Sequence, residues 1–73
     1  MRLEQVIGTN VRRLRKARGL SQEALAAECG IDMRYLGGIE RGQENPTIKV
    51  VGDIAKALGV AASTLLIEPR TRA

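Results

Sequence analysis

The chain of 73 residues contains no histidine, tryptophan or phenylalanine, and it has one cysteine and one tyrosine. Without histidine, catalysis would rest on carboxylates, a hydroxyl, lysine or Cys29, and no pair of these has the expected spacing. A redox or metal switch at Cys29 would need partner ligands that the sequence lacks. We therefore expect a protein that is not an enzyme and uses no cofactor or metal, with Cys29 as a small core residue.

Long apolar runs are also absent. No segment approaches the roughly 18–20 residues needed to span a bilayer, and no signal peptide is visible. No stretch alternates apolar with polar residues, which argues against β-sheet. The composition, with 44% hydrophobic and 27% charged residues, is that of a globular protein. Together with the helical pattern described below, it predicts one small all-α domain over residues 1–67 and a polar tail over 68–73. The lone cysteine favours a reducing, cytoplasmic setting, and the length leaves no room for a small-molecule effector domain.

Positive charge is present in excess and is unevenly distributed. The net charge is +4 and the sequence pI is about 10.0, which favours polyanionic partners. Five basic residues fall within seven consecutive positions: Arg12, Arg13, Arg15, Lys16 and Arg18. This run of basic residues could also be a solvated helix face that binds nothing. A membrane-surface helix is a further alternative, but the stretch lacks the Trp or Phe anchors of such helices.

Apolar periodicity predicts five short helices, separated by glycines and polar caps. They cover about residues 3–18, 21–30, 32–42, 47–59 and 62–67. Ser21, Asp32 and Thr47 are suitable N-caps for the middle three helices. Leu3 and Ile48 fall on the apolar stripes of their helices, so both are expected to face inward.

The connection between the second and third helices is very short, at about three residues around Gly30 and Ile31. A glycine-containing connection of this length forces a sharp crossing, which is typical of a helix-turn-helix. In that motif the second helix of the pair lies in the DNA major groove, with its N-terminal residues at base edges. The alternative is an ordinary tight corner in a small helical bundle.

The sequence resembles the Cro/phage-repressor-type helix-turn-helix family, also called lambda repressor-like or XRE. The matching elements are V-R-R-L-R-K-x-R-G before Leu20, G-L-S-Q-E-x-L-A at 19–26, Gly30, Y-L-x-x-I-E-R-G at 35–42, N-P-T at 45–47 and I-A-x-A-L-G-V at 54–60. The resemblance covers most of the chain. It implies a five-helix DNA-binding domain with its motif at about 21–40. It further implies a homodimeric transcriptional regulator, such as a repressor, on a two-fold-symmetric operator in double-stranded DNA.

The third helix carries the candidate base-reading residues. If Leu36 and Ile39 are buried, Arg34 and Gly38 point directly away from the core, with Gly37 beside them. The guanidinium of Arg34 suits guanine O6 and N7, and the alternative is a phosphate contact or a solvated side chain. Bare backbone at the two glycines would let the helix approach DNA closely. The alternative is that base reading ends at Arg34 and the glycines reflect tolerance or packing.

Residues on the flanks of this helix are weaker candidates for DNA contact. Met33 could touch a thymine methyl or pack against the second helix, and Asp32 stands at the start of the same helix. Tyr35 is either a core residue or, as the family implies, places its hydroxyl on the DNA backbone. Gln22, at the start of the second helix, is expected to reach a phosphate, and the resemblance implies that it also buttresses the third helix.

Polar residues after the third helix are further candidates for phosphate contacts, which position the protein without reading sequence. They are Gln43, Asn45, Thr47 and Lys49. Arg12 and Arg13 would add salt-dependent attraction. By resemblance, Arg15 and Glu40 form a structural ion pair, which would remove Arg15 from the DNA-contact set.

The resemblance also implies a dimer contact near the fifth helix. Candidates are Val60, Leu66 and Ile67, whereas Leu65 is expected in the monomer core. Two functions remain as alternatives within the same fold. The run Y-L-G-G-I-E-R-G and the small size are similar to controller proteins of restriction–modification systems, and an antitoxin or other protein-interaction module would use the same fold.

Overall fold

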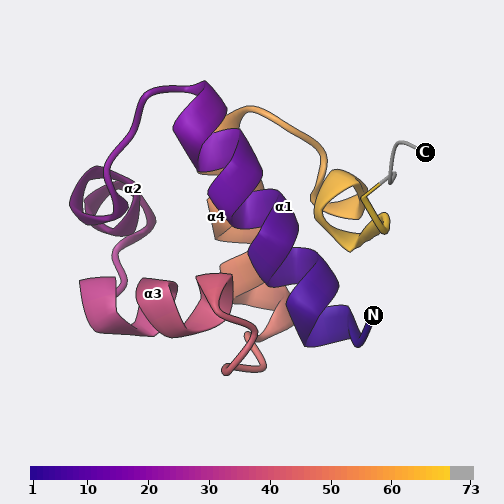
Figure 1. Cartoon of the computed structure of the whole chain (residues 1–73). Coiled ribbons are helices and arrows are strands. Elements are labelled where there is room, and N and C mark those ends of the chain that lie inside the picture. The colour runs from indigo at the N-terminus through magenta and orange to yellow at the C-terminus, as the bar shows by residue number, and fades with distance from the viewer. Residues whose placement is uncertain (70–73) are drawn as a thin grey trace.

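The computed structural model describes residues 1–69, and the regular secondary structure over that range consists of helices alone. Four α-helices follow one another as α1 (Leu3–Ala17), α2 (Gln22–Cys29), α3 (Met33–Glu40) and α4 (Ile48–Leu58), and a 3₁₀ helix, η1 (Ala62–Leu66), ends the fold. In Figure 1, α1 runs across the front of α4, with α2 and the start of α3 on one side and η1 on the other. The all-α class predicted from the sequence is confirmed. The predicted tail falls largely in residues 70–73, outside the described range.

The middle helices begin at the polar caps that the sequence indicates. The side chains of Ser21 and Thr47 accept hydrogen bonds from the backbone N–H groups of Ala24 and Val50, at 3.0 and 3.2 Å. Gly30 ends α2 with a φ of 69°, in the left-handed region that glycine adopts without a steric penalty. These local signals set the helix boundaries.

The fifth helix is the point at which the predicted five-α-helix architecture is wrong. Residues Ala62–Leu66 form a 3₁₀ helix, and Ala61 before them offers no side-chain cap. The buried amide of Asn10 in α1 donates to the carbonyl oxygens of Leu65 and Ile67, at 2.9 and 2.8 Å. Because these carbonyls bond to a side chain of another helix, η1 is fixed by a tertiary contact and not by α-helical hydrogen bonds.

The core is aliphatic and lies between α1, α4 and the helix-turn-helix pair. Its fully buried side chains are Val11, Leu25, Leu36, Ile39, Ile54 and Leu65. Two predicted inward residues are not part of it, because Leu3 is 56% exposed and Ile48 is 92% exposed. Both stand in the first turn of a helix, beyond the edge of the packed interface. The predicted burial of these two residues is therefore wrong, because periodicity does not show where the packed interface ends.

Helix α1 approaches the end of α3 very closely at Gly8. A β-carbon at this position would overlap the carbonyl oxygen of Ile39 and stand 2.9 Å from that of Glu40. Only glycine fits such an approach of backbone to backbone. The contact fixes the C-terminal end of α3 against α1, while its N-terminal end remains at the surface.

Within residues 1–69, no helix is both long enough and apolar enough to cross a membrane.

Candidate nucleic-acid interface

The sharp turn between α2 and α3 presents the first turn of α3 at the surface (Figure 1). Asp32 caps this helix, and its carboxylate accepts a hydrogen bond of 2.7 Å from the backbone N–H of Arg34. That bond, followed by the nearby charge of Arg34, lowers the pKa of Asp32. The carboxylate also lies 3.6 Å from Nε of Arg34. Asp32, one of the predicted DNA-contact residues, is thus placed where it orders the start of the helix and faces its arginine.

The candidate base-reading side chains of this turn differ in exposure. The Arg34 side chain is 91% exposed, and Met33 is 47% exposed. Tyr35 is half-buried and packs against the hydrophobic core. The structure therefore brings Arg34 and Met33 together at one solvent-facing end, with Tyr35 between this end and the core.

Gly38 was expected to present bare backbone to solvent, and the structure corrects that expectation. The residue is buried, and a β-carbon on it would stand 2.7 Å from Cγ of Glu44. Gly37 is also buried, and a β-carbon on it would stand 3.2 Å from Nη1 of Arg41. The helix face predicted to be bare is therefore covered by two side chains that follow α3 in the sequence.

Arg15 and Glu40 form the buried ion pair that the resemblance implies. Arg15 Nε and Nη2 donate to the two carboxylate oxygens of Glu40, at 2.7 and 3.0 Å. The hydrogen bond to Glu40 raises the pKa of Arg15, against the opposing effect of burial. Gln22 Nε2 donates to the same carboxylate at 3.0 Å. Gln22, predicted to reach a phosphate, is thus placed beside α3 and linked to its last residue.

The polar residues predicted to contact phosphates lie in the loop and at the start of α4, and all four are exposed. Gln43 accepts a hydrogen bond of 3.0 Å from Arg41 Nε. Thr47 caps α4, and Lys49 forms an ion pair of 2.9 Å with Asp53. Asn45 lies beside them. The loop thus continues the surface that begins at α3.

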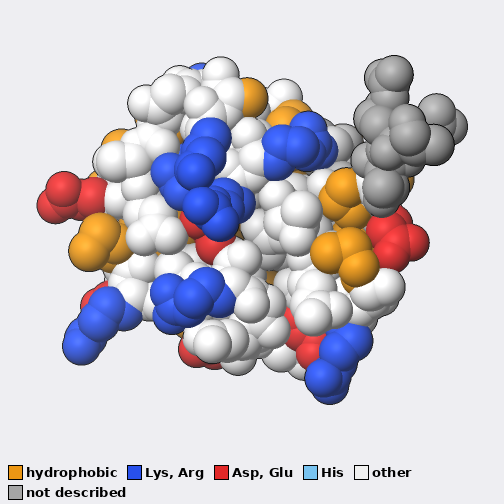
Figure 2. All heavy atoms as spheres, viewed as in Figure 1, with side chains coloured by type: hydrophobic (Ala, Val, Ile, Leu, Met, Phe, Trp, Pro, Cys, Tyr) orange, Lys and Arg blue, Asp and Glu red, His pale blue; other side chains and the backbone are white. Residues whose placement is uncertain are grey.

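Basic side chains gather on the same side of the molecule. Figure 2 shows Lys and Arg over α1 and over α3 on one face. Arg12 and Arg13 of α1 are exposed, and Arg13 also donates to the Asn10 side chain at 3.3 Å. This face has the charge expected of a surface that meets a polyanion.

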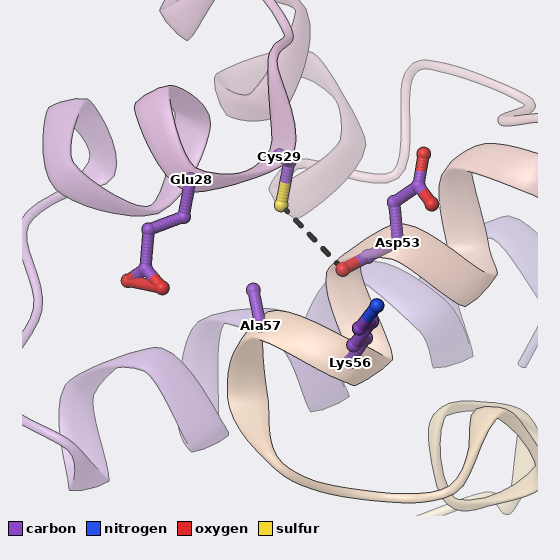
Figure 3. Close-up of a pocket in the computed structure, with 5 residues that line it drawn as sticks. All are labelled: Glu28, Cys29, Asp53, Lys56 and Ala57. Atoms are coloured by element: carbon purple, nitrogen blue, oxygen red, sulfur yellow. Dashed lines mark hydrogen bonds between the residues drawn. The ribbon is translucent and has the colours of Figure 1, made fainter.

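Cys29 lies at an open hollow between the end of α2 and α4, lined by Glu28, Asp53, Lys56 and Ala57 (Figure 3). Its thiol points at the Asp53 carbonyl oxygen, 3.9 Å away. Burial raises the pKa of the thiol, and the charges of Asp53 and Glu28 raise it further. Since a protonated thiol is a poor nucleophile, Cys29 contributes packing against the core.

The predicted dimer-contact residues separate into two environments. Val60 is half-buried and packs against the core, whereas Leu66 is 46% exposed and Ile67 is also exposed. Leu66 lines an apolar groove with Leu3 and Ile48. The groove lies between the first turns of α1 and α4 and η1, and sequence periodicity did not reveal it because it assigned Leu3 and Ile48 to the core.

Sequence reasoning missed three residues that position α3, η1 and the loop after α3: Gly8, Asn10 and Glu44. Asn10 is a polar residue on the apolar stripe of α1, and that position could have indicated a buried hydrogen-bonding role. Gly8 and Glu44 gave no such signal, because their roles depend on chain segments far away or on the path of a loop.

Comparison with known proteins gives consistent results. The family model described as helix-turn-helix matches residues 11–65. An HTH-type transcriptional regulator of Sinorhizobium fredii, y4dJ, is 41% identical over 84% of this chain and 79% of its own. The hypothetical transcription factor NHTF from Neisseria superposes with a TM-score of 0.89 at 41% identity, covering 93% of this chain and 78% of that protein. The restriction–modification controller C.AhdI from Aeromonas hydrophila superposes at 0.82, with 42% identity and coverage of 85% and 94%.

Proposed function

The chain belongs to the helix-turn-helix family of transcriptional regulators, and on that premise we propose that it binds double-stranded DNA in a sequence-specific manner as a homodimer. The resemblance inferred from the sequence is confirmed by the family match. In the proposed complex, α3 enters the major groove with its N-terminal turn foremost. The operator is two-fold symmetric, because two copies related by a two-fold axis present identical helices to it.

The observation that carries this proposal is the exposed Arg34 at the start of α3. Its side chain projects from the first turn of the helix that follows the sharp turn, where the motif brings residues to base edges. A guanidinium in that place offers two parallel donors, which match guanine O6 and N7. Arg34 is therefore the principal base-reading residue.

Groups around Arg34 contact the phosphates of the DNA backbone in the proposed complex. The start of α2 has free N–H groups and a positive helix end close to Gln22. Exposed Gln43, Asn45 and Lys49 extend the surface beyond α3. These groups hold the protein in register and contribute salt-dependent affinity, while they leave the choice of sequence to α3.

The homodimer is supported by the apolar groove beside η1. Leu3, Ile48 and Leu66 expose large apolar side chains to it, and such a cluster is unusual for a surface that meets only water. The groove is lined by residues of η1 and of the first turns of α1 and α4, and η1 lies on the other side of α1 from α2 and the start of α3 (Figure 1). A second copy docked there leaves both recognition helices free to reach successive major grooves, about 34 Å apart.

A second candidate is control of a restriction–modification system. It is favoured by the match to C.AhdI, of which this chain covers 94% at 42% identity. The two candidates share the DNA interface and differ in the genes regulated. A binding site located in front of restriction or modification genes would favour the controller.

The experiment that tests the proposed function is selection of bound duplexes from a randomised library, with sequencing of the bound pool. We expect an enriched two-fold-symmetric motif with the wild-type protein. In Arg34→Ala, one position in each half-site should lose about 1–3 kcal/mol of discrimination, because one base contact disappears. The matched variant Arg12→Ala should keep the motif and only reduce the salt dependence of binding. A wild-type pool with no motif would contradict the proposal.

A further inference from the structure

The two adjacent glycines of α3 lie beneath side chains from the residues that follow the helix. A β-carbon built on Gly37 would lie 3.2 Å from Nη1 of Arg41, and one built on Gly38 would lie 2.7 Å from Cγ of Glu44. The Glu44 carboxylate itself is 3.2 Å from the same point. The glycines therefore form a recess along α3 into which the loop lays an arginine and a glutamate.

This recess is on the DNA-facing side of α3. Gly38 follows Arg34 by four residues, so the two positions lie on one side of the helix, about one turn apart. The buried side chains of Leu36 and Ile39 occupy the other side. Glu44, placed over Gly38, thus stands next in line to Arg34 along the helix.

The carboxylate of Glu44 differs from the other acidic groups near α3. Asp32 caps the helix and Glu40 is paired with Arg15. Glu44 is exposed, and within residues 1–69 its carboxylate has neither an ion-pair nor a hydrogen-bond partner. An unpaired negative charge on a surface that meets phosphates weakens binding, unless the DNA supplies a hydrogen-bond donor to it.

In the major groove, the donor that a glutamate matches is the N4 amino group of cytosine. We propose that Glu44 is a specificity-determining residue that accepts a hydrogen bond from cytosine N4, and that glycine at position 38 is required to hold it along the helix. The inference rests on the function proposed above and names one base of the operator. It also gives the glycine pair a role: the loop supplies the base-reading side chain that α3 omits.

The test is the duplex selection carried out with Glu44→Gln. Glutamine keeps the length and shape of the side chain, but its neutral amide is a weaker acceptor and carries an N–H donor that matches adenine and not cytosine. The preference for cytosine at one position of each half-site should fall about 5-fold or more. The matched control is Glu28→Gln, which removes the same charge from an exposed residue beside α4. It should leave the preferred base at every position unchanged.

The possible outcomes separate this inference from the proposed function. If Glu44→Gln leaves the wild-type base preferences intact, or raises affinity for all sequences equally, Glu44 does not read a base and the inference is overturned. A loss of preference at an adenine would overturn the assignment to cytosine. A wild-type pool without any motif would remove the proposed function itself, and the inference with it.

A second variant, Gly38→Ala, tests the role of the recess. The added β-carbon meets the Glu44 side chain, which is exposed and can rotate away. Alanine favours the helix over glycine, so the melting temperature should not fall. We expect the same loss of cytosine preference as in Glu44→Gln. Unchanged preference with a folded protein would show that Glu44 acts independently of Gly38 and would overturn that part of the inference.

Discussion

Individual side chains hold the recognition helix in place through the buried pair of Arg15 and Glu40. The pair is bidentate, and its two side chains are almost fully removed from water. Arg15 Nη1 also donates to the Leu20 carbonyl oxygen at 2.8 Å, so one guanidinium joins α1, the loop after it and the end of α3. A buried charge is tolerated only while its partners remain.

At this scale we predict that Arg15→Met destabilises the protein by about 3–5 kcal/mol, because the Glu40 carboxylate is left buried without its partner. The measurement is urea unfolding followed by circular dichroism. Lys49→Met is the matched control, since Lys49 forms an exposed ion pair with Asp53, and its loss should cost less than about 1 kcal/mol. Equal effects of the two substitutions would contradict the structural role of Arg15.

Helices α1 and α3 cross at a distance that one residue determines. Gly8 allows the backbone of α1 to touch the carbonyl groups of Ile39 and Glu40. Backbone atoms of a packed helix cannot move aside as an exposed side chain can. Gly52 in α4 offers the contrast, because a β-carbon there would meet nothing within 4 Å.

We therefore predict opposite effects of the same substitution in these two helices. Gly8→Ala should destabilise the protein by about 1–3 kcal/mol, through overpacking against α3. Gly52→Ala should stabilise it by up to about 1 kcal/mol, since alanine is the better helix former and nothing obstructs it. Thermal unfolding of both variants measures the difference. A stabilising Gly8→Ala would show that α1 and α3 are farther apart than described.

The whole molecule has two surfaces with different chemistry. The start of α3 and the exposed basic residues of α1 present positive charge (Figure 2), while the groove between α1, α4 and η1 is apolar. Helix η1 and the start of α3 lie on opposite sides of α1 (Figure 1), and the two surfaces approach each other at Asn45, which lines the groove. In the proposed complex, the surface at α3 binds DNA and the groove binds a second copy.

The prediction at this scale concerns oligomeric state. Leu66→Ser should convert a dimer into a monomer of 7.9 kDa, because it removes an exposed apolar side chain from the proposed contact. Met33→Ser is a suitable control, since Met33 is 47% exposed and Leu66 46%, yet Met33 lies at the DNA-facing end of α3. Sedimentation equilibrium distinguishes the two masses. A wild-type monomer, or a Leu66→Ser dimer, would rule out this groove as the dimer contact.

The amino-acid sequence by itself determined the starts of the three middle α-helices and the family. Ser21, Asp32 and Thr47 act as caps on their own helices, and Gly30 ends α2 in the left-handed region. These interactions join residues two or three apart, so they can be read from a short segment of sequence. Helical periodicity placed Arg34 at the surface, opposite Leu36 and Ile39, and its side chain is exposed.

Only the tertiary structure decided the features that depend on distant segments. Asn10 fixes η1 as a 3₁₀ helix through carbonyl groups near the end of the fold. Ile48 and Leu3 lie on apolar stripes but fall outside the packed interface. Glu44 covers Gly38 because of the path that the loop takes after α3. Helical periodicity gives the direction of a side chain about its own axis, whereas burial depends on which other segment comes to meet it.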